Sequence, residues 1–324
     1  MTSRLQKLLW HAKWGALHSI ECALFSLVFP FAVRIGGRTA RRIACLIGKL
    51  RYHLDIDWRT ISLRHHFVRE RTLTAMQEIL PDAPPEVLDR LVRERFVHSA
   101  QEELDAHYFF LDQALVRECS FEGLETVRMA ASKTGVIYLT LHLDSAPMAI
   151  AQMGRAGLPI NFMMSDIVND ARVPPVLRRY FRRKYEGIRS HLRGGQFWPI
   201  ETNMRDFYRT LKQGEGAVIL CEAPAQSQDD SLPIEFLGKI RFFKRGALRL
   251  AEKTGAALAG MICLRTGLDR YKIVFSPVYD PAVVGSVNAI QKVYTFLGEA
   301  VKSTPERWWA ADLLPSFIKA GERH

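Results

Sequence analysis

Cysteine is scarce in this chain, and its few cysteines form no recognisable pattern. Five occur among 324 residues, widely spaced and without a Cys-x-x-Cys pair. Neither a disulfide framework nor a zinc site is therefore indicated, and we expect a reducing compartment.

Other metal and cofactor signatures are also missing. The sequence contains no Walker or dinucleotide-binding fingerprint. Four histidines of the helical stretch 39–110 lack a second ligand at the spacing of a metal-binding helix, so we expect surface or packing roles for them. These are His65, His66, His98 and His107. The sequence predicts no metal and no cofactor.

Acidic residues are in deficit. The chain has 45 Lys and Arg against 34 Asp and Glu, a formal charge of +11. This balance indicates an anionic partner such as nucleic acid, phospholipid head groups, a phosphorylated substrate or an acidic carrier protein. No nucleic-acid-binding module is recognisable, and nucleic acid would leave the apolar N-terminus unexplained, so we predict no nucleic-acid partner.

An apolar stretch covers residues 16–35, with tryptophans before it and arginines after it. It is nearly long enough to cross a bilayer, but Glu21, Pro30 and Arg34 interrupt it. Basic and aromatic flanks suit a helix lying in the membrane interface. We therefore predict surface attachment, with a buried hairpin or a true span as alternatives.

The chain has two regions with different secondary-structure patterns. Residues 39–110 have helical apolar spacing, clearest over 86–106, whereas strands and helices alternate after Phe121. The expected strands are 136–141, 160–164, 217–221, 257–264 and 271–275. We predict an α/β fold with a central, mostly parallel or mixed sheet flanked by helices, and a division into a helical, membrane-associating segment (1–118) and an α/β domain (119–324).

Residues 136–150 suggest a site. A short strand without alternation, typical of burial on both faces, is followed by His142, Asp144 and Ser145, and then by a helix with Pro147 in its first turn. The carboxyl end of such a strand is where open α/β sheets bind ligands. His142 is thus a candidate catalytic base, the alternative being a bystander beside a helix cap.

Four segments follow one another in a characteristic order. They are a strand ending on His142, a helix and strand ending on Glu222, a phenylalanine and glycine turn at 234–238 followed by a helix and strand, and Pro-Glu-Arg-Trp-Trp at 305–309. In this order they resemble the lipid A late acyltransferases of the lysophospholipid acyltransferase superfamily. The resemblance implies acyl transfer at the cytoplasmic face of the inner membrane by a peripheral or monotopic protein.

One position departs from that family. Its signature places Asp or Glu five residues after the histidine, where this chain has Pro147. Proline cannot orient an imidazole, so another carboxylate must do so. Asp144 is the first choice because it is nearest, with Glu222 and Asp166 as alternatives, although Asp144 could simply cap the helix.

Two other side chains are weaker candidates for chemistry. Cys221, at a strand end, could act as a thiolate nucleophile, but a buried strand cysteine is more often a small packing residue. Ser145 lacks the Gly-x-Ser-x-Gly elbow of a nucleophile and suits a helix cap better.

Basic residues form two groups. Eight lie within 172–193, interleaved with aromatics, and five within 239–249. A solvated helical face is the plain interpretation, and a phosphate-binding or carrier-docking surface is the functional one. We assign the first group to carrier docking. By the resemblance, the candidate substrate-binding residues are Arg189, Gly238, Arg241 and Lys244.

Together these features predict an acyltransferase with His142 as general base and Asp144 or Glu222 as its partner. It moves an acyl group from an acyl carrier protein or coenzyme A thioester to a hydroxyl or amine of a lipid or related acceptor. The alternatives are an acyltransferase acting on a small non-lipid metabolite, and a non-catalytic lipid- or carrier-binding relative.

Overall fold

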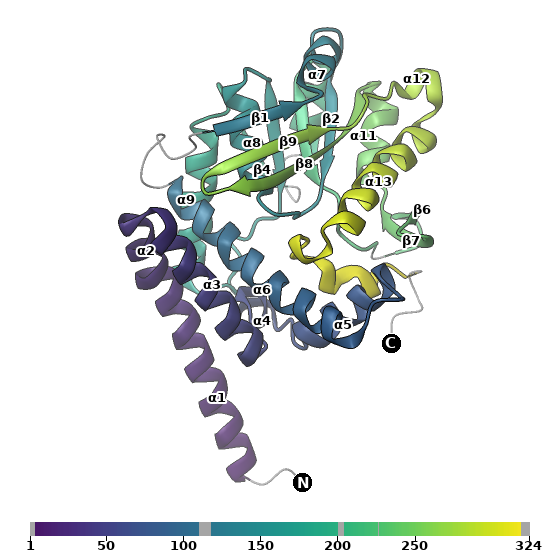
Figure 1. Cartoon of the computed structure of the whole chain (residues 1–324). Helices are drawn as coiled ribbons and strands as arrows, with labels where there is room; N and C mark the ends of the chain where they lie inside the picture. The colour runs from purple at the N-terminus through teal and green to yellow at the C-terminus, as the bar shows by residue number, and fades with distance from the viewer. Residues whose placement is uncertain (1–3, 110–117, 200–203, 226, 319–324) are drawn as a thin grey trace.

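The structure, a computed structural model, describes residues 4–109, 118–199, 204–225 and 227–318, with side chains from Trp14 onward. Figure 1 shows a sheet domain with helices α2 to α6 packed along one side and α1 extending away from the body. The N-terminal helices are α1 (Arg4–Ala23), α2 (Phe29–Ile35), α3 (Gly37–Leu54), α4 (Trp58–Leu63), α5 (Val68–Ile79) and α6 (Pro85–Tyr108), with a π-helical turn η1 (Leu24–Val28) joining α1 to α2.

The described part of the α/β region contains a seven-stranded sheet in the order β1-β9-β8-β2-β5-β3-β4. Its strands are β1 (Glu118–Glu122), β2 (Val136–Thr140), β3 (Ile160–Met164), β4 (Phe197–Pro199), β5 (Gly216–Leu220), β8 (Ala257–Gly267) and β9 (Arg270–Phe275). Only β8 and β9 pair antiparallel within it. The predicted mixed, mostly parallel sheet is confirmed.

Helices and one hairpin complete the fold. They are α7 (Leu124–Ala131), α8 (Ala146–Arg155), α9 (Pro175–Arg189), α10 (Met204–Lys212), α11 (Gly246–Thr254), α12 (Pro281–Val284), α13 (Ser286–Ser303), the 3₁₀ turns η3 (Pro305–Arg307) and η4 (Ala311–Ser316), and the hairpin β6 (Ser231–Phe236) with β7 (Lys239–Lys244). Leu237 and Gly238 join β6 to β7 with positive φ at both positions, as a tight two-residue hairpin requires.

The strand preceding His142 lies in the middle of the sheet. All five residues of β2 are buried, and parallel neighbours β5 and β8 cover both of its edges. Apolar side chains on both faces explain why its sequence does not alternate. The predicted strands were found within three residues of their expected ends, whereas β1, β4, β6 and β7 were not predicted.

A buried ion pair ties the apolar N-terminal run to the body. Arg51 on α3 donates to both oxygens of Glu21, at 2.8 and 2.7 Å, and contacts Glu103 of α6 at 2.5 Å. Glu21 and Arg51 are 0% and 1% exposed. Because removing one member leaves a buried charge unpaired, the pair fixes α1 against α3 and α6.

Aromatic rings strengthen the same junction. The His107 ring of α6 stacks on Phe29 at 5.2 Å and lies 4.9 Å from the ring of Tyr180 on α9. Burial lowers the pKa of His107 to about 4. His107 is therefore neutral in the folded protein at neutral pH, and protonating it opposes folding.

The pKa shift of His107 yields a prediction about acid stability. The folded pKa lies below the ordinary value of 6.5, so the stabilisation is present above pH 6.5 and is lost as pH falls from there toward 4. The loss attributable to this group is about 3 kcal/mol. The His107→Phe variant keeps the ring contacts and should show a shallower fall in urea-unfolding free energy over this interval. Parallel curves for the two proteins would contradict the assignment.

Candidate active site

Strand register brings the two principal candidates together. Strands β2 and β5 pair in parallel with Thr140 opposite Leu220. Two residues further on, His142 and Glu222 leave the same edge of the sheet side by side, and the imidazole Nδ1 contacts the Glu222 carboxylate directly. The pair therefore lies at the carboxyl ends of central parallel strands.

Protein donors surround the Glu222 carboxylate. The backbone N–H of His142 donates to both oxygens at 3.1 Å, and the Trp308 indole N–H donates to Oε2 at 2.7 Å. Glu222 is 4% exposed. Buried carboxylates need such donors, and together with the imidazole they hold the acid in one orientation.

The imidazole is more open than its partner. The His142 side chain is 23% exposed, and its ring packs edge-on against Trp309 with centroids 4.3 Å apart. The tautomer that fits a contact with a carboxylate, which only accepts hydrogen bonds when ionised, carries its proton on Nδ1 and its lone pair on Nε2. That tautomer is the one a general base requires.

The C-terminal segment pins the loop that carries His142. Asp144 N–H donates to the Arg307 carbonyl at 2.8 Å, and Trp309 N–H donates to the His142 carbonyl at 3.1 Å. Between these bonds, Leu143 and Trp308 form an antiparallel bridge. A short loop is thereby fixed by a segment far along the chain.

Asp144, the first-choice partner of His142, lies elsewhere. Its carboxylate accepts from the Arg265 backbone N–H at 2.6 Å and from the Arg307 guanidinium at 2.9 Å, and no contact joins it to His142 among the described residues. Asp144 has a φ of 53°, which turns its side chain into the protein. The expected pairing is thus corrected in favour of Glu222.

Arginines make Asp144 an internal anion. It is 1% exposed, and burial alone would raise its pKa, but Arg265 at 3.2 Å and the hydrogen bonds it receives hold the pKa well below the usual range. Arg265 also pairs with Asp105 of α6 at 3.0 Å, and Asp105 pairs with Arg41 of α3. The network joins the loop after β2 to the N-terminal helices.

A second network lies behind Trp309. The Trp309 carbonyl accepts from Arg95 of α6 at 2.7 Å, and its ring lies 4.7 Å from the guanidinium of Arg59. Both arginines donate to Asp312 at 2.9 Å. These contacts hold in place the ring against which His142 packs.

The environments of the weaker catalytic candidates, Cys221, Ser145 and Asp166, indicate roles in packing, helix capping and local hydrogen bonding. Burial raises the pKa of the Cys221 thiol to about 12, so it is protonated and poorly nucleophilic. Ser145 stands at the N-cap position of α8 and is fully buried. Asp166 accepts from Asn169. No group of three or more His, Cys, Asp or Glu among the described residues is placed to hold a metal ion.

The candidate substrate-binding residues are scattered. Gly238 forms the β6-β7 turn, whose Phe236 packs 6.0 Å from the Trp308 ring. Arg241 is 5% exposed, and its guanidinium contacts Glu78 at 2.5 Å and the Leu314 carbonyl. Lys244 is half-buried on β7, and Arg189 is exposed at the end of α9. Among the described residues, none of these four contacts His142 or Glu222 through a hydrogen bond or an ion pair.

Sequence reasoning missed the contribution of three consecutive residues. Arg307 contacts Asp144, Trp308 contacts Glu222 and Trp309 contacts His142. The Pro-Glu-Arg-Trp-Trp motif supports the family resemblance, but the sequence alone assigns it no role. The two adjacent tryptophans were the signal in the sequence that could have indicated this role. A buried indole N–H usually needs a hydrogen-bond acceptor, which a buried carboxylate such as Glu222 provides.

Removing the Asp144 charge should destabilise the protein. Asp144→Asn deprives Arg265 and Arg307 of a buried counter-charge, and we expect a loss of about 3–5 kcal/mol in the free energy of unfolding. Asp170→Asn is the control, because it breaks a solvent-exposed pair with Arg172 and should leave the free energy of unfolding nearly unchanged. Equal effects in urea titrations of the two variants would contradict the role given to Asp144.

Comparison with known proteins identifies the family. The family model for bacterial lipid A biosynthesis acyltransferases matches residues 53–311. A search of curated proteins finds no match. Among solved structures, the 1-acyl-sn-glycerophosphate (LPA) acyltransferase PlsC from Thermotoga maritima is 18% identical, with 82% of this chain and 98% of that chain covered and a TM-score of 0.35. The matched span is most of the chain, so this protein belongs to the bacterial lipid A biosynthesis acyltransferases.

Proposed function

We propose that this acyltransferase uses His142 as its general base, oriented by Glu222, to move an acyl group from a carrier thioester to a lipid acceptor. The observation that carries the proposal is the contact between His142 Nδ1 and the buried Glu222 carboxylate. It supplies the acid that the family signature has at the position of Pro147. In this proposal, Glu222 just after the end of β5 takes the role of the acid that is missing at Pro147 of α8.

The proposed step needs only these two side chains and the substrates. Nε2 of His142 takes the proton of the acceptor hydroxyl as its oxygen attacks the thioester carbonyl. Glu222 stabilises the imidazolium that forms, since the carboxylate lies against Nδ1. The tetrahedral adduct then collapses, the carbon–sulfur bond breaks, and the imidazolium proton passes to the leaving thiolate.

Membership of the family supports an acyl donor and a lipid acceptor, and the finer classes are part of the proposal. The donor is a thioester on acyl carrier protein or coenzyme A, and the acceptor is a hydroxyl or amine of a lipid. Mass spectrometry of transfer from each donor to lipid, amine and small-metabolite acceptors separates these cases. Absence of transfer in every combination favours a non-catalytic lipid- or carrier-binding protein. Transfer only to a small metabolite favours an acyltransferase with a non-lipid acceptor.

Substitutions of the pair should change rate rather than fold. We expect His142→Ala to abolish transfer and Glu222→Gln to lower kcat about 10²- to 10⁴-fold, because glutamine keeps the shape of the acid but not its charge. Initial rates with a fixed donor check both, with thermal unfolding as the control. Unchanged turnover of His142→Ala would rule out the proposed base. A Glu222→Gln enzyme as fast as the parent would rule out its partner.

We further propose attachment to a membrane surface through the N-terminal helices. Among the described helices, the run Trp14–Ile35 is long and apolar enough to cross a bilayer, and 39% of its most apolar window is buried. Near the middle of this run, Glu21 is buried in an ion pair with Arg51 of α3, so this part of the run faces the protein. That packing favours a run lying on the membrane over one crossing it.

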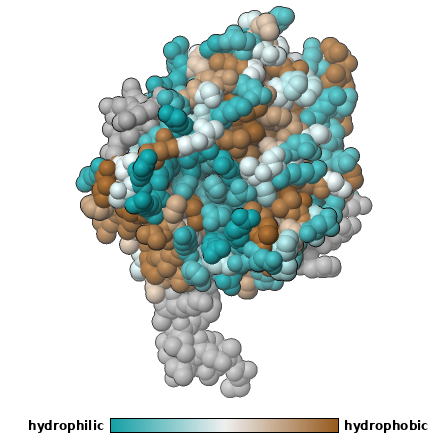
Figure 2. Space-filling model, viewed as in Figure 1, coloured by the Kyte–Doolittle hydropathy of each residue, from teal (hydrophilic) through white to brown (hydrophobic). Residues whose placement is uncertain are grey.

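An apolar face on this run supports the attachment. Leu27, Phe31 and Ile35 are 67%, 61% and 48% exposed and recur every fourth residue, so they share one side of the helix. Leu46 and Leu50 of α3 are also exposed. Figure 2 shows hydrophobic residues at the surface where α2 and α3 lie.

Polar substitutions on this face test the attachment. The combined variant Leu27→Gln, Phe31→Gln, Ile35→Gln should lower partitioning onto vesicles about 100-fold, since each side chain contributes about 1 kcal/mol or more on burial. The measurement is co-sedimentation with phospholipid vesicles. Deleting the helix is a poorer test, because it would also leave Arg51 without Glu21.

The control uses exposed apolar residues elsewhere. Val283 and Val287 near α12 and Met129 of α7 are 79%, 53% and 60% exposed. Their replacement by glutamine should leave vesicle binding within about twofold of the parent. Comparable losses in the two triple variants would refute attachment through the α2 face.

A further inference from the structure

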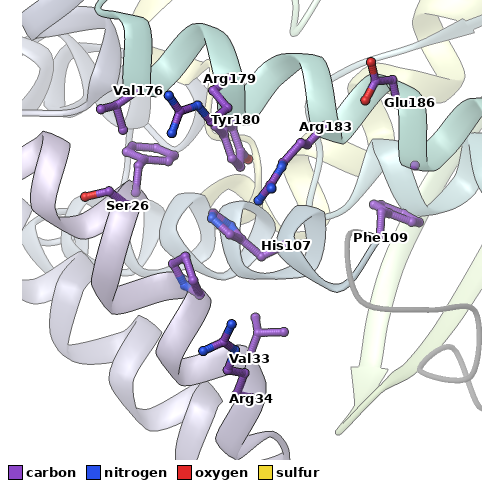
Figure 3. Close-up of a pocket in the computed structure, with 13 residues that line it drawn as sticks. Ser26, Val33, Arg34, His107, Phe109, Val176, Arg179, Tyr180, Arg183 and Glu186 are labelled. Atoms are coloured by element: carbon purple, nitrogen blue, oxygen red, sulfur yellow. The ribbon is translucent and has the colours of Figure 1, made fainter.

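A cavity lies apart from the His142 site. Its volume is about 600 Å³, and it opens between the η1 and α2 segment on one side and α9 with the end of α6 on the other. Figure 3 shows Arg183 pointing from α9 toward His107, with Arg34 of α2 on the opposite side. The lining does not include His142 or Glu222.

The charge of the cavity has one dominant sign. Its lining contains three arginines, Arg34, Arg179 and Arg183, against one acid, Glu186. Arg34 and Arg179 are paired with no acid among the described residues. Arg179 and Arg183 are four residues apart and so share one face of α9. Convergent guanidinium groups suit phosphate oxygens, which they bind with paired hydrogen bonds.

The cavity adjoins the apolar face of α2. Arg34 directly precedes Ile35 and follows Phe31 by three residues, and both neighbours are exposed. An arginine cluster next to an exposed apolar face is the arrangement that meets a lipid phosphate when the apolar residues enter the interface.

The cavity and the His142 loop lie at different positions along α6. His98 of α6 lies 3.9 Å from Asp144, in the loop that carries His142, and His107 lines the cavity nine residues further along the same helix. At 1.5 Å per residue this is a separation of about 14 Å along the helix axis. The cavity and the loop that carries His142 therefore lie against different parts of α6.

We infer that this cavity binds the anionic phosphate headgroup of a membrane lipid, as a site distinct from the reaction centre. The inference rests on the proposed membrane attachment, which supplies the lipid. Three arginines confer the preference for negative charge, and the aromatic walls formed by Phe25, Phe109 and Tyr180 accommodate the glycerol end of the headgroup.

The test compares two vesicle compositions with the full chain. Phosphatidylcholine vesicles report attachment through the apolar face, and phosphatidylcholine vesicles doped with phosphatidic acid report the additional phosphate site. We expect doped vesicles to bind more tightly. The Arg34→Gln, Arg179→Gln variant should lose about 25-fold on doped vesicles, at about fivefold for each arginine, and little on neutral ones.

A control variant that removes the same number of charges distinguishes binding in the cavity from attraction of the vesicle by the overall surface charge. Arg38 and Arg182 are exposed arginines near the same helices and outside the cavity lining. Arg38→Gln, Arg182→Gln should retain most of the preference for doped vesicles. Equal losses in the two double variants would overturn the inference in favour of general surface charge.

Two further measurements distinguish a lipid headgroup from free phosphate. If inorganic phosphate alone binds in isothermal titration as tightly as short-chain phosphatidic acid does, the cavity takes free phosphate and the lipid assignment is wrong. Isothermal titration with soluble short-chain phosphatidic acid makes the result independent of vesicle attachment. Binding there that is lost in Arg34→Gln, Arg179→Gln supports the site even if the parent protein fails to bind neutral vesicles, and no binding overturns it.

Discussion

The hydrogen bond from the Trp308 indole to Glu222, at 2.7 Å, ties the C-terminal segment to the candidate active site. Its neighbours extend the attachment, since Arg307 contacts Asp144 and Trp309 packs on His142. Arg59 and Arg95 hold Trp309 from behind. The imidazole is therefore oriented by groups that are themselves fixed by packing, as preorganised catalysis requires.

Charge burial explains why so many arginines lie inside this protein. Asp144, Asp312 and Glu21 are each 1% exposed or less, and each is paired with at least one arginine. Such networks contribute little net stability compared with apolar packing, but removing one partner is costly because it leaves the other charge buried and unpaired. Each of these buried arginines is balanced by acids within its own network.

The sequence was sufficient for the fold class and for the position of His142 at a strand end, because strand burial and the break after β2 are local signals. Its first choice for the group beside the imidazole was wrong: proximity favoured Asp144, whereas the side chain in contact is Glu222, an alternative 80 residues away that strand register brings alongside. Register depends on pairing across the sheet, which local patterns do not contain. Of the unpredicted strands, β4 has only three residues, and β1 has no buried residue and so lacks the apolar run of the central strands. β6 and β7 form a hairpin whose packing on Trp308 is nonlocal. Arg241 illustrates the same limit, since its partner Glu78 lies on a distant helix.

The tautomer of His142 tests its proposed pairing with Glu222 most directly. Nitrogen-15 NMR of histidine-labelled protein, with a His142→Gln sample to assign the signal, reports which ring nitrogen carries the proton. We predict a neutral ring protonated at Nδ1 in the parent protein and a loss of that preference in Glu222→Gln. A ring protonated at Nε2, or a spectrum that Glu222→Gln leaves unchanged, would contradict the pairing.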